Sequence, residues 1–414
     1  MTMIERDTYD ILISGGGLVG ASLACALSGH GLRIGLVEAV AYGDPGVDSG
    51  QSAYDDRAIA LAAGTQRIFA AMGLWPALAE RATPIHRIHV SDRGRFGFVR
   101  LDRADEGVEA LGYVALGRDL GAVLGARLAG LDDVELISPA RVTGVDFAGD
   151  SARVRIEAAA GERHVGTRLL VAADGAQSTL RDLLKVPTTV WEYGQTAVIA
   201  NVTPERPHEH VAYERFTDSG PLALLPMSEG RCALVWTLRD DQVDAVMALD
   251  DAAFLARLQE RFGGRLGRLT RVGRRSAYPL RLVRARESVR PRLALIGNAA
   301  HTLHPIAGQG FNLGLRDVAA LAEVLLEARR AGRDLGDPAV LGRYADWRRG
   351  DHRRVIAFTD GLTRLFASPL PPVAWARDLG MLALDLCPPA KRLFARLTMG
   401  KAGRLPKLAR GLGL

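Results

Sequence analysis

Three glycines near the start of the chain are spaced to bind a phosphate group. They form the pattern Gly15-x-Gly17-x-x-Gly20, which follows an apolar run ending at Ile13. Glycine in such a turn lets backbone N–H groups and the N-terminus of the next helix approach a pyrophosphate. Glu38 ends the following apolar run, where an acid can accept hydrogen bonds from a ribose. The spacing predicts a dinucleotide site; the alternative is a glycine-rich turn in a plain α/β core.

Two further segments place small and polar residues directly after buried strands. Residues 169–181 form an apolar strand that ends in Asp174-Gly175. Residues 292–317 form a strand, a loop of small residues and the start of a helix. With the glycine turn, they make three motifs in order along the chain.

The three motifs together resemble a known family. Their types and order, from Tyr9 to about Arg330, are similar to those of the flavoprotein aromatic hydroxylases, the family of para-hydroxybenzoate hydroxylase. Residues 55–75 and 297–317 look like the ubiquinone-biosynthesis branch, in particular the 2-polyprenyl-6-methoxyphenol hydroxylases. The resemblance implies FAD as the cofactor and NAD(P)H as the electron donor.

The resemblance also implies which residues hold FAD. Asn298 stands where the family usually has Asp, but its amide oxygen can still accept a ribose hydroxyl. Arg57 and Arg118 would contact the cofactor from helices, and residues 305–312 would lie along the isoalloxazine. The implied cofactor-binding residues are Gly15, Gly17, Gly20, Glu38, Arg57, Arg118, Asp174, Gly175, Asn298, Gly308, Gln309, Gly310 and Asn312.

The implied reaction is a monooxygenation. Reduced FAD would react with O2 to give a C4a-hydroperoxide, whose distal oxygen attacks an electron-rich phenol ring. A helix starting near Gly310 would stabilise negative charge at N1–C2=O of the flavin, and a water-poor pocket would protect the peroxide. His304 and Pro305 would lie nearest the reacting face and are the catalytic candidates. His304 either hydrogen-bonds substrate or shapes the loop.

Two histidine pairs could suggest a metal site. They are His301-x-x-His304 and His208-x-His210. Neither pair has further ligands at a spacing that would complete a coordination shell. We therefore expect no metal.

The order of apolar runs predicts an α/β fold. We expect a Rossmann-like FAD-binding domain, with an inserted sheet-based substrate domain and a C-terminal helical region with a basic tail. The segment from Ala58 to Leu78 is predicted to be helical. The predicted boundaries are 1–80, 105–185 and 276–345 for the FAD domain, 81–104 and 186–275 for the substrate domain, and 346–414 for the helical region.

The positive charge of the chain is concentrated at its C-terminus. The 414 residues carry a formal net charge of +6, and residues 386–414 contain seven basic residues and no acid. Because that segment carries +7, residues 1–385 sum to −1. A near-neutral body argues against nucleic-acid binding. The three cysteines form no paired motif, and the start of the chain lacks a signal-peptide pattern, so we expect a cytoplasmic protein.

The basic tail has an amphipathic stretch. Residues 391–397 place Leu393, Phe394 and Leu397 on one helical side and Arg392 with Arg396 on another. Such a helix can lie on a membrane surface. The expected partners are thus a polyprenyl phenol, O2, and either the inner-membrane surface or a lipid-binding ubiquinone-biosynthesis complex. The alternative is a solvated basic tail.

Other functions fit parts of this pattern. A sibling hydroxylase could act at another ring position or on a soluble phenol. A flavin-dependent prenyl-lipid reductase would not couple to O2. A non-catalytic prenyl-protein binder of the GDP-dissociation-inhibitor kind would not need the second and third motifs, both of which are present.

Overall fold

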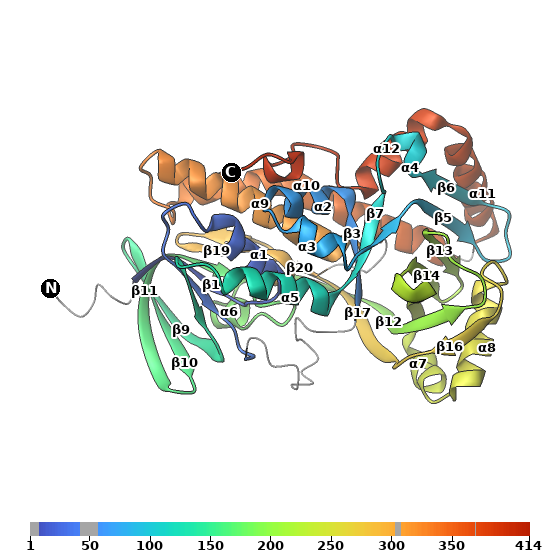
Figure 1. Ribbon diagram of the computed structural model, residues 1–414, viewed down its shortest axis with the longest axis horizontal. Coiled ribbons are helices and arrows are strands. Elements are labelled where there is room, and N and C mark those ends of the chain that lie inside the picture. Colours follow the sequence, from blue (N-terminus) through green and yellow to red (C-terminus); the bar gives the residue numbers. More distant parts are fainter. Residues whose placement is uncertain (1–7, 42–56, 303–307, 369) are drawn as a thin grey trace.

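The computed structural model describes residues 8–41, 57–302, 308–368 and 370–414. Two large sheets lie toward opposite ends of the long axis, and long helices cover them (Figure 1). A small three-stranded sheet lies between the two. The predicted α/β class is confirmed. The predicted domain boundaries stay a prediction.

The first sheet has the order β18-β19-β11-β1-β2-β8, with β10 and β9 extending it from β11. Strands β19 to β8 are parallel, and β18 pairs antiparallel with β19. Its central strand pairs Ile13 with Val171 on one side and with Leu36 on the other. Parallel strands covered on both faces are nearly all apolar, as these are. The strands are β1 (Thr8–Ser14), β2 (Ile34–Val37), β8 (Val134–Ile137), β9 (Ala140–Ala148), β10 (Ser151–Ala158), β11 (Gly161–Ala172), β18 (Val289–Arg290) and β19 (Leu293–Leu295).

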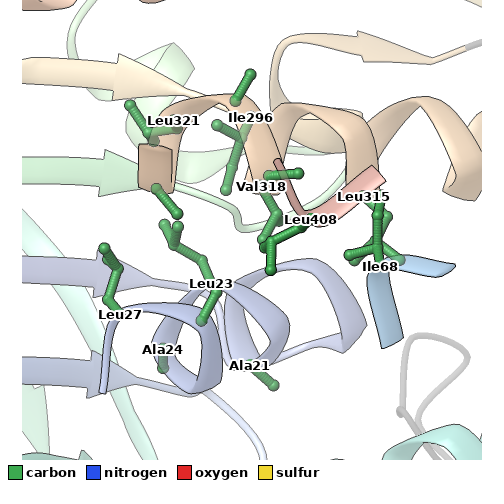
Figure 2. Packing of buried hydrophobic residues seen from close by; sticks show 14 of the residues in the cluster. Ala21, Leu23, Ala24, Leu27, Ile68, Ile296, Leu315, Val318, Leu321 and Leu408 are labelled. Atoms are coloured by element: carbon green, nitrogen blue, oxygen red, sulfur yellow. The ribbon is translucent and has the colours of Figure 1, made fainter. Parts of the chain in front are cut away.

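Helices cover one face of this sheet and the curled β9–β10 hairpin covers the other. The covering helices are α1 (Leu18–Leu27), α5 (Gly117–Leu128), α9 (Gln309–Arg330) and α10 (Pro338–Ala367). Figure 2 shows Leu23 of α1 and Val318 of α9 packed in this core together with Leu408 from near the C-terminus. Each fully buried leucine contributes about 2 kcal/mol.

The second sheet is largely antiparallel, in the order β20-β17-β12-β15-β14-β13-β5-β6, with β16 beside β12. Helices α7 (Asp240–Met247) and α8 (Asp251–Phe262) pack on one face. The other face is turned toward a cavity. The strands are β5 (Arg87–Asp92), β6 (Phe98–Asp102), β12 (Thr188–Pro204), β13 (Val211–Thr217), β14 (Gly220–Pro226), β15 (Cys232–Arg239), β16 (Leu269–Val272), β17 (Ser276–Ala285) and β20 (His301–Thr302).

The helix predicted from Ala58 to Leu78 is wrong in its first part. Ala58–Ala62 is strand β3, which pairs antiparallel with β7 (Gly112–Leu116), and β4 (Thr83–Ile85) pairs with β7 on its other side. Alanine favours a helix locally, but the ladder with β7 outweighs that weak preference. Short helices α2 (Ala63–Ala71) and α3 (Trp75–Ala79) follow. The remaining short helices are α4 (Arg103–Glu106) and α6 (Thr179–Leu183).

Prolines open the last three helices, α10, α11 (Pro371–Leu386) and α12 (Pro388–Thr398). The segment after α12 returns to the first sheet and ends in the short 3-10 helix η5 (Leu408–Arg410). Leu408 is buried there, and the backbone N–H of Lys407 donates to Glu323 at 2.6 Å. The alternative interpretation, a solvated basic tail, is therefore wrong for these two residues. No helix in the described part of the chain is long and apolar enough to span a bilayer.

Candidate active site

A single large cavity of about 1010 Å³ joins the ends of both sheets. Its walls are the glycine turn after β1, the N-terminus of α9, the open face of the second sheet, and helices α10 to α12. Ligand pockets usually measure roughly 300–1,000 Å³. The cavity therefore has room for a flavin ring and an apolar substrate together.

The three glycines of the turn have three different reasons to be glycine. Gly15 has φ +104°, and a Cβ there would lie 2.5 Å from the carbonyl oxygen of Ala173. A Cβ on Gly20 would overlap the carbonyl oxygen of Gly15. Gly17, the N-cap of α1, faces open space in the cavity wall. This arrangement fits a pyrophosphate against the α1 N-terminus.

Glu38 follows β2 and closes the turn from the side. Its Oε2 accepts a 2.6 Å hydrogen bond from Gly16 N–H, and its Oε1 accepts one from Val40 N–H at 3.0 Å. The carboxylate thereby fixes the backbone of the glycine turn. Binding of a ribose by Glu38 stays a prediction.

Asp174 and Gly175 follow the end of β11, beside the glycine turn. Oδ2 of Asp174 accepts from Leu180 N–H at 3.0 Å, whereas its buried Oδ1 has no partner within the described residues. Burial raises the pKa of this carboxyl. Gly175 has φ +87° and lines the cavity with nothing near its Cβ position. An unpartnered buried acceptor beside an open glycine fits a hydroxyl-rich ligand such as FAD.

The two predicted arginines are placed differently. Arg57 lines the cavity, with its guanidinium 5.0 Å from the ring centroid of Tyr278. Arg118 is exposed in the first turn of α5 and is outside the cavity wall, which its neighbour Gly117 joins. Arg57 precedes strand β3, so the expectation that a helix carries it is wrong.

The N-terminus of α9 forms another wall. Gly308 is its N-cap, and a Cβ there would lie 2.7 Å from the Cβ of Ala60, so the helix start sits tightly on β3. Gly310 and Asn298, two of the implied cofactor-binding residues, line the cavity. Gln309 does not: it is buried and donates to Thr398 O at 3.2 Å, which ties α9 to α12.

Asn312 lines the cavity but uses both ends of its amide within the protein. Its Oδ1 accepts from Ala62 N–H at 2.8 Å and from the Thr65 hydroxyl at 2.6 Å. Its Nδ2 donates to Ala60 O at 2.8 Å and to Gly308 O at 2.6 Å. Asn312 thus holds β3, α2 and α9 together at the cavity wall.

Comparison with known proteins decides the family. A sequence model of the FAD binding domain family matches residues 8–359. The ubiquinone hydroxylase UbiL of Rhodospirillum rubrum is 42% identical, over 98% of this chain and 93% of that protein. The 3-demethoxyubiquinol 3-hydroxylase of Escherichia coli is 31% identical, over 94% of this chain and 98% of that protein. The chain belongs to the ubiquinone-biosynthesis branch of the flavoprotein aromatic hydroxylases.

The fold of this hydroxylase is shared more widely. The crystal structure of the p-nitrophenol 4-monooxygenase PnpA from Pseudomonas putida superposes with a TM-score of 0.79 at 20% identity, covering 96% of this chain and 100% of that one. The hydroxylase is an FAD-dependent enzyme. The predicted catalytic pair, His304 and Pro305, lies outside the described residues.

The described residues of the hydroxylase contain a cluster of side chains of the metal-ligand type, which includes only one member of the two histidine pairs. Ligand atoms of His301, Asp317 and His352 lie within 4.8 Å of one another. Arg348 already holds Asp317 Oδ1 at 2.7 Å. Burial alone would raise the pKa of Asp317, but His352, Arg348 and His301 outweigh it and hold that pKa well below its usual range. The arrangement is that of a buried ion-pair network joining α9 to α10.

The other histidine pair holds backbone. His208 Nε2 lies 2.9 Å from Met227 O, and its Nδ1 accepts from His210 N–H at 3.1 Å. His210 Nδ1 lies 3.1 Å from Pro84 O. These contacts brace the loop before β13.

Sequence reasoning missed the face of the second sheet that forms one wall of the cavity in this hydroxylase. Alternate residues of seven strands line it, for example Val90, Ala223 and Val235. One member of this face is Glu214 on β13. In the segment AYERFT, the available signal was an acid at an alternate position between Ala212 and Phe216, but strand pairing was needed to show its neighbours.

Proposed function

We propose that this enzyme hydroxylates a polyprenylated (methoxy)phenol on the route to ubiquinone, with NAD(P)H as electron donor and O2 as oxygen source. The single supporting observation is the continuous apolar cavity from the FAD-binding turn to helices α10–α12. A small soluble phenol would not need that length of apolar wall. The relatives act, by name, in ubiquinone chemistry.

FAD, when bound, supplies the oxygen-activating chemistry. The residues of this chain position it and control its surroundings. Gly17 and the start of α1 hold the pyrophosphate, and Asp174 Oδ1 is available to a ribityl or ribose hydroxyl. The N-terminus of α9 places positive partial charge at the cavity wall, where it stabilises negative charge on the reduced ring. His304 and Pro305 complete this proposal as the residues nearest the reacting face.

Helices α11 and α12 give the substrate a place to enter. Met381, Leu384 and Phe394 line the cavity from these helices, while Trp375 and Leu393 on the same helices are exposed by 58% and 61%. One isoprene unit is worth roughly 4 kcal/mol of transfer from water. A substrate with several units resides in a membrane. The exposed apolar side chains, with basic residues on α12, dock the enzyme on an anionic bilayer surface.

The test uses the purified full-length protein with FAD, NAD(P)H, O2 and a short-chain prenyl-methoxyphenol. Expected are a flavin absorption spectrum and one oxygen atom from labelled O2 in the product. A protein without bound flavin would overturn the proposal. Substrate reduction without O2 would assign a prenyl-lipid reductase instead, and equal turnover of unprenylated phenols would assign a hydroxylase for soluble phenols.

A further inference from the structure

Glu214 lies in the middle of the cavity-facing sheet. On β13 it pairs with Val90 of β5 on one side and with Ala223 of β14 on the other. The same row continues through Val235 and Ile199. All five side chains line the cavity, and Glu214 is the polar member of the row.

Glu214 is the only acid among the described residues that line the cavity. The cavity also contains two cations, and both lie against other groups. Arg377 of α11 forms an ion pair with Asp92, and Arg57 lies over the ring of Tyr278. Within the described ranges no hydrogen-bond or ion-pair partner reaches the Glu214 carboxylate.

The two residues beside Glu214 on its own strand contact Phe262, although Tyr213 also borders the cavity. Arg215 donates to Phe262 O at 2.6 Å, and the Tyr213 ring lies edge-on to Phe262, whose helix α8 covers the opposite face of the sheet. The residues opposite Glu214 on the two paired strands are Val90 of β5 and Ala223 of β14, and neither carries a charge. Burial alone raises the pKa of Glu214 to about 7. An unpaired carboxylate in such a place is costly unless a ligand satisfies it.

We propose that Glu214 binds the phenolic hydroxyl of the substrate and acts as the base that removes its proton. The proposal rests on the function proposed above. The substrate must present a hydrogen-bond donor to satisfy this carboxylate, and its phenol is the donor next to the ring that reacts. The remaining wall of the row is apolar and suits a prenylated ring.

The phenol O–H bond breaks, its proton moves to Glu214, and the electron pair stays on oxygen and increases electron density at the neighbouring ring carbons. One such carbon would form a C–O bond to one oxygen atom of O2, which bound FAD would activate. The second oxygen atom would leave as water, and NAD(P)H would supply the two electrons. The ring then loses its C–H proton, and Glu214 returns a proton to the oxygen. General-base help of this kind contributes roughly 10²–10⁴-fold.

The test compares the wild-type holoenzyme with Glu214→Gln, and with Glu209→Gln as matched control. Glu209 is an exposed glutamate in the loop before β13, where it pairs with Arg87. For Glu214→Gln we expect unchanged FAD binding and a rate at least about 100-fold lower. The rise of wild-type kcat/KM with pH through about 7 should disappear. Glu209→Gln should behave as wild type.

Two further readouts separate a base from a structural residue. A more acidic, fluorinated phenol should restore much of the Glu214→Gln rate, because it ionises without help. A phenolate difference spectrum on substrate binding should be present in wild type and absent in Glu214→Gln, and this readout does not depend on turnover. Glu214→Asp, which keeps a carboxylate, should retain partial activity.

Different results would overturn the role of Glu214 and the proposed hydroxylase function. Wild-type hydroxylation with an unaltered rate and pH profile in Glu214→Gln would overturn the role of Glu214 and leave the function standing. An equal loss with ordinary and fluorinated phenols would also overturn it. A wild-type enzyme that ionises phenol without hydroxylating it would overturn the function alone. If Glu214→Gln does not fold, Glu214→Asp with the full wild-type rate would contradict a base at this position, because the shorter side chain moves the carboxylate away from the phenol.

Discussion

The backbone at Gly15 approaches Ala173 so closely that a methyl group on Gly15 would stand 2.5 Å from the Ala173 carbonyl oxygen. The contact joins the ends of β1 and β11, the two adjacent parallel strands that precede the glycine turn and the Asp-Gly turn. Two of the three sequence motifs are therefore held in register by a position that accepts only glycine. Gly17 has no such contact in the protein.

Substituting these two glycines should separate folding from cofactor binding. Gly15→Ala should destabilise the protein by about 3 kcal/mol or more, because it combines a positive φ with a backbone clash. Gly17→Ala should fold normally, since its Cβ meets open space, but should bind FAD at least about tenfold more weakly. Thermal melting of the apoprotein and FAD titration by fluorescence measure the two effects.

Gly29→Ala is the matched control for the positive φ. Gly29 has φ +79° with nothing near its Cβ position, and it lies at the far end of α1 from the turn. We expect a loss of about 1 kcal/mol and normal FAD affinity. Equal FAD affinity of Gly17→Ala and wild type would contradict pyrophosphate binding at this turn.

Asn312→Asp should destabilise the junction of β3 and α9. The carboxylate keeps the two hydrogen bonds to Ala62 and Thr65 but loses both donors, and it then faces the carbonyl oxygens of Ala60 and Gly308. A loss of about 3 kcal/mol is expected from chemical denaturation. Asn201→Asp on β12 is the control and should change stability by about 0.5 kcal/mol or less. Similar losses in both variants would contradict this account of Asn312.

Acidification should destabilise the fold through His89. Burial, and next the charges of Arg265, Arg100 and Arg215, lower the pKa of His89 to about 4 from its usual value near 6.5. Because the unfolded chain binds the proton first, stability is complete above about pH 6.5 and falls as the pH drops toward 4. In His89→Phe this part of the pH dependence should disappear.

The measurement for His89 is the free energy of unfolding at a series of pH values from 7 down to about 4. Phe can keep the ring contacts to Phe98 and Tyr213, whose centroids lie about 6 Å from that of His89. A His164→Phe variant serves as control, because His164 is an exposed residue on β11. An unchanged pH dependence in His89→Phe would show that other groups carry it.

The sequence predicts the parts of this protein that depend on local patterns. The glycine turn, the strand before Asp174 and the helix after Gly308 follow from spacing and apolar runs. Strand β3 and the burial of Leu408 do not, because each depends on a partner more than fifty residues away, β7 in one case and the α1–α9 core in the other. Glu214 was missed for the same reason. Its position in an apolar row of the cavity wall depends on its pairing with β5 and β14.

The burial of Leu408 also changes how membrane docking must be tested. Deleting residues 386–414 would remove core packing as well as α12, so a loss of binding would be ambiguous. Substitution of exposed side chains avoids this. The double variant Trp375→Ser/Leu393→Ser removes two side chains that are 58% and 61% exposed. It should keep the thermal stability and FAD content of wild type.

Flotation with vesicles containing anionic phospholipid measures the docking. We expect at least about tenfold weaker association for the double variant, because burying each of these side chains in a bilayer contributes about 1.5–3 kcal/mol. Phe147→Ser is the control, since Phe147 is similarly exposed (42%) on β9 at the opposite end of the molecule (Figure 1). Its vesicle binding should equal that of wild type. Equal binding by the double variant and wild type would show that α11 and α12 do not dock on lipid, and the exposed side chains would then belong to a protein interface.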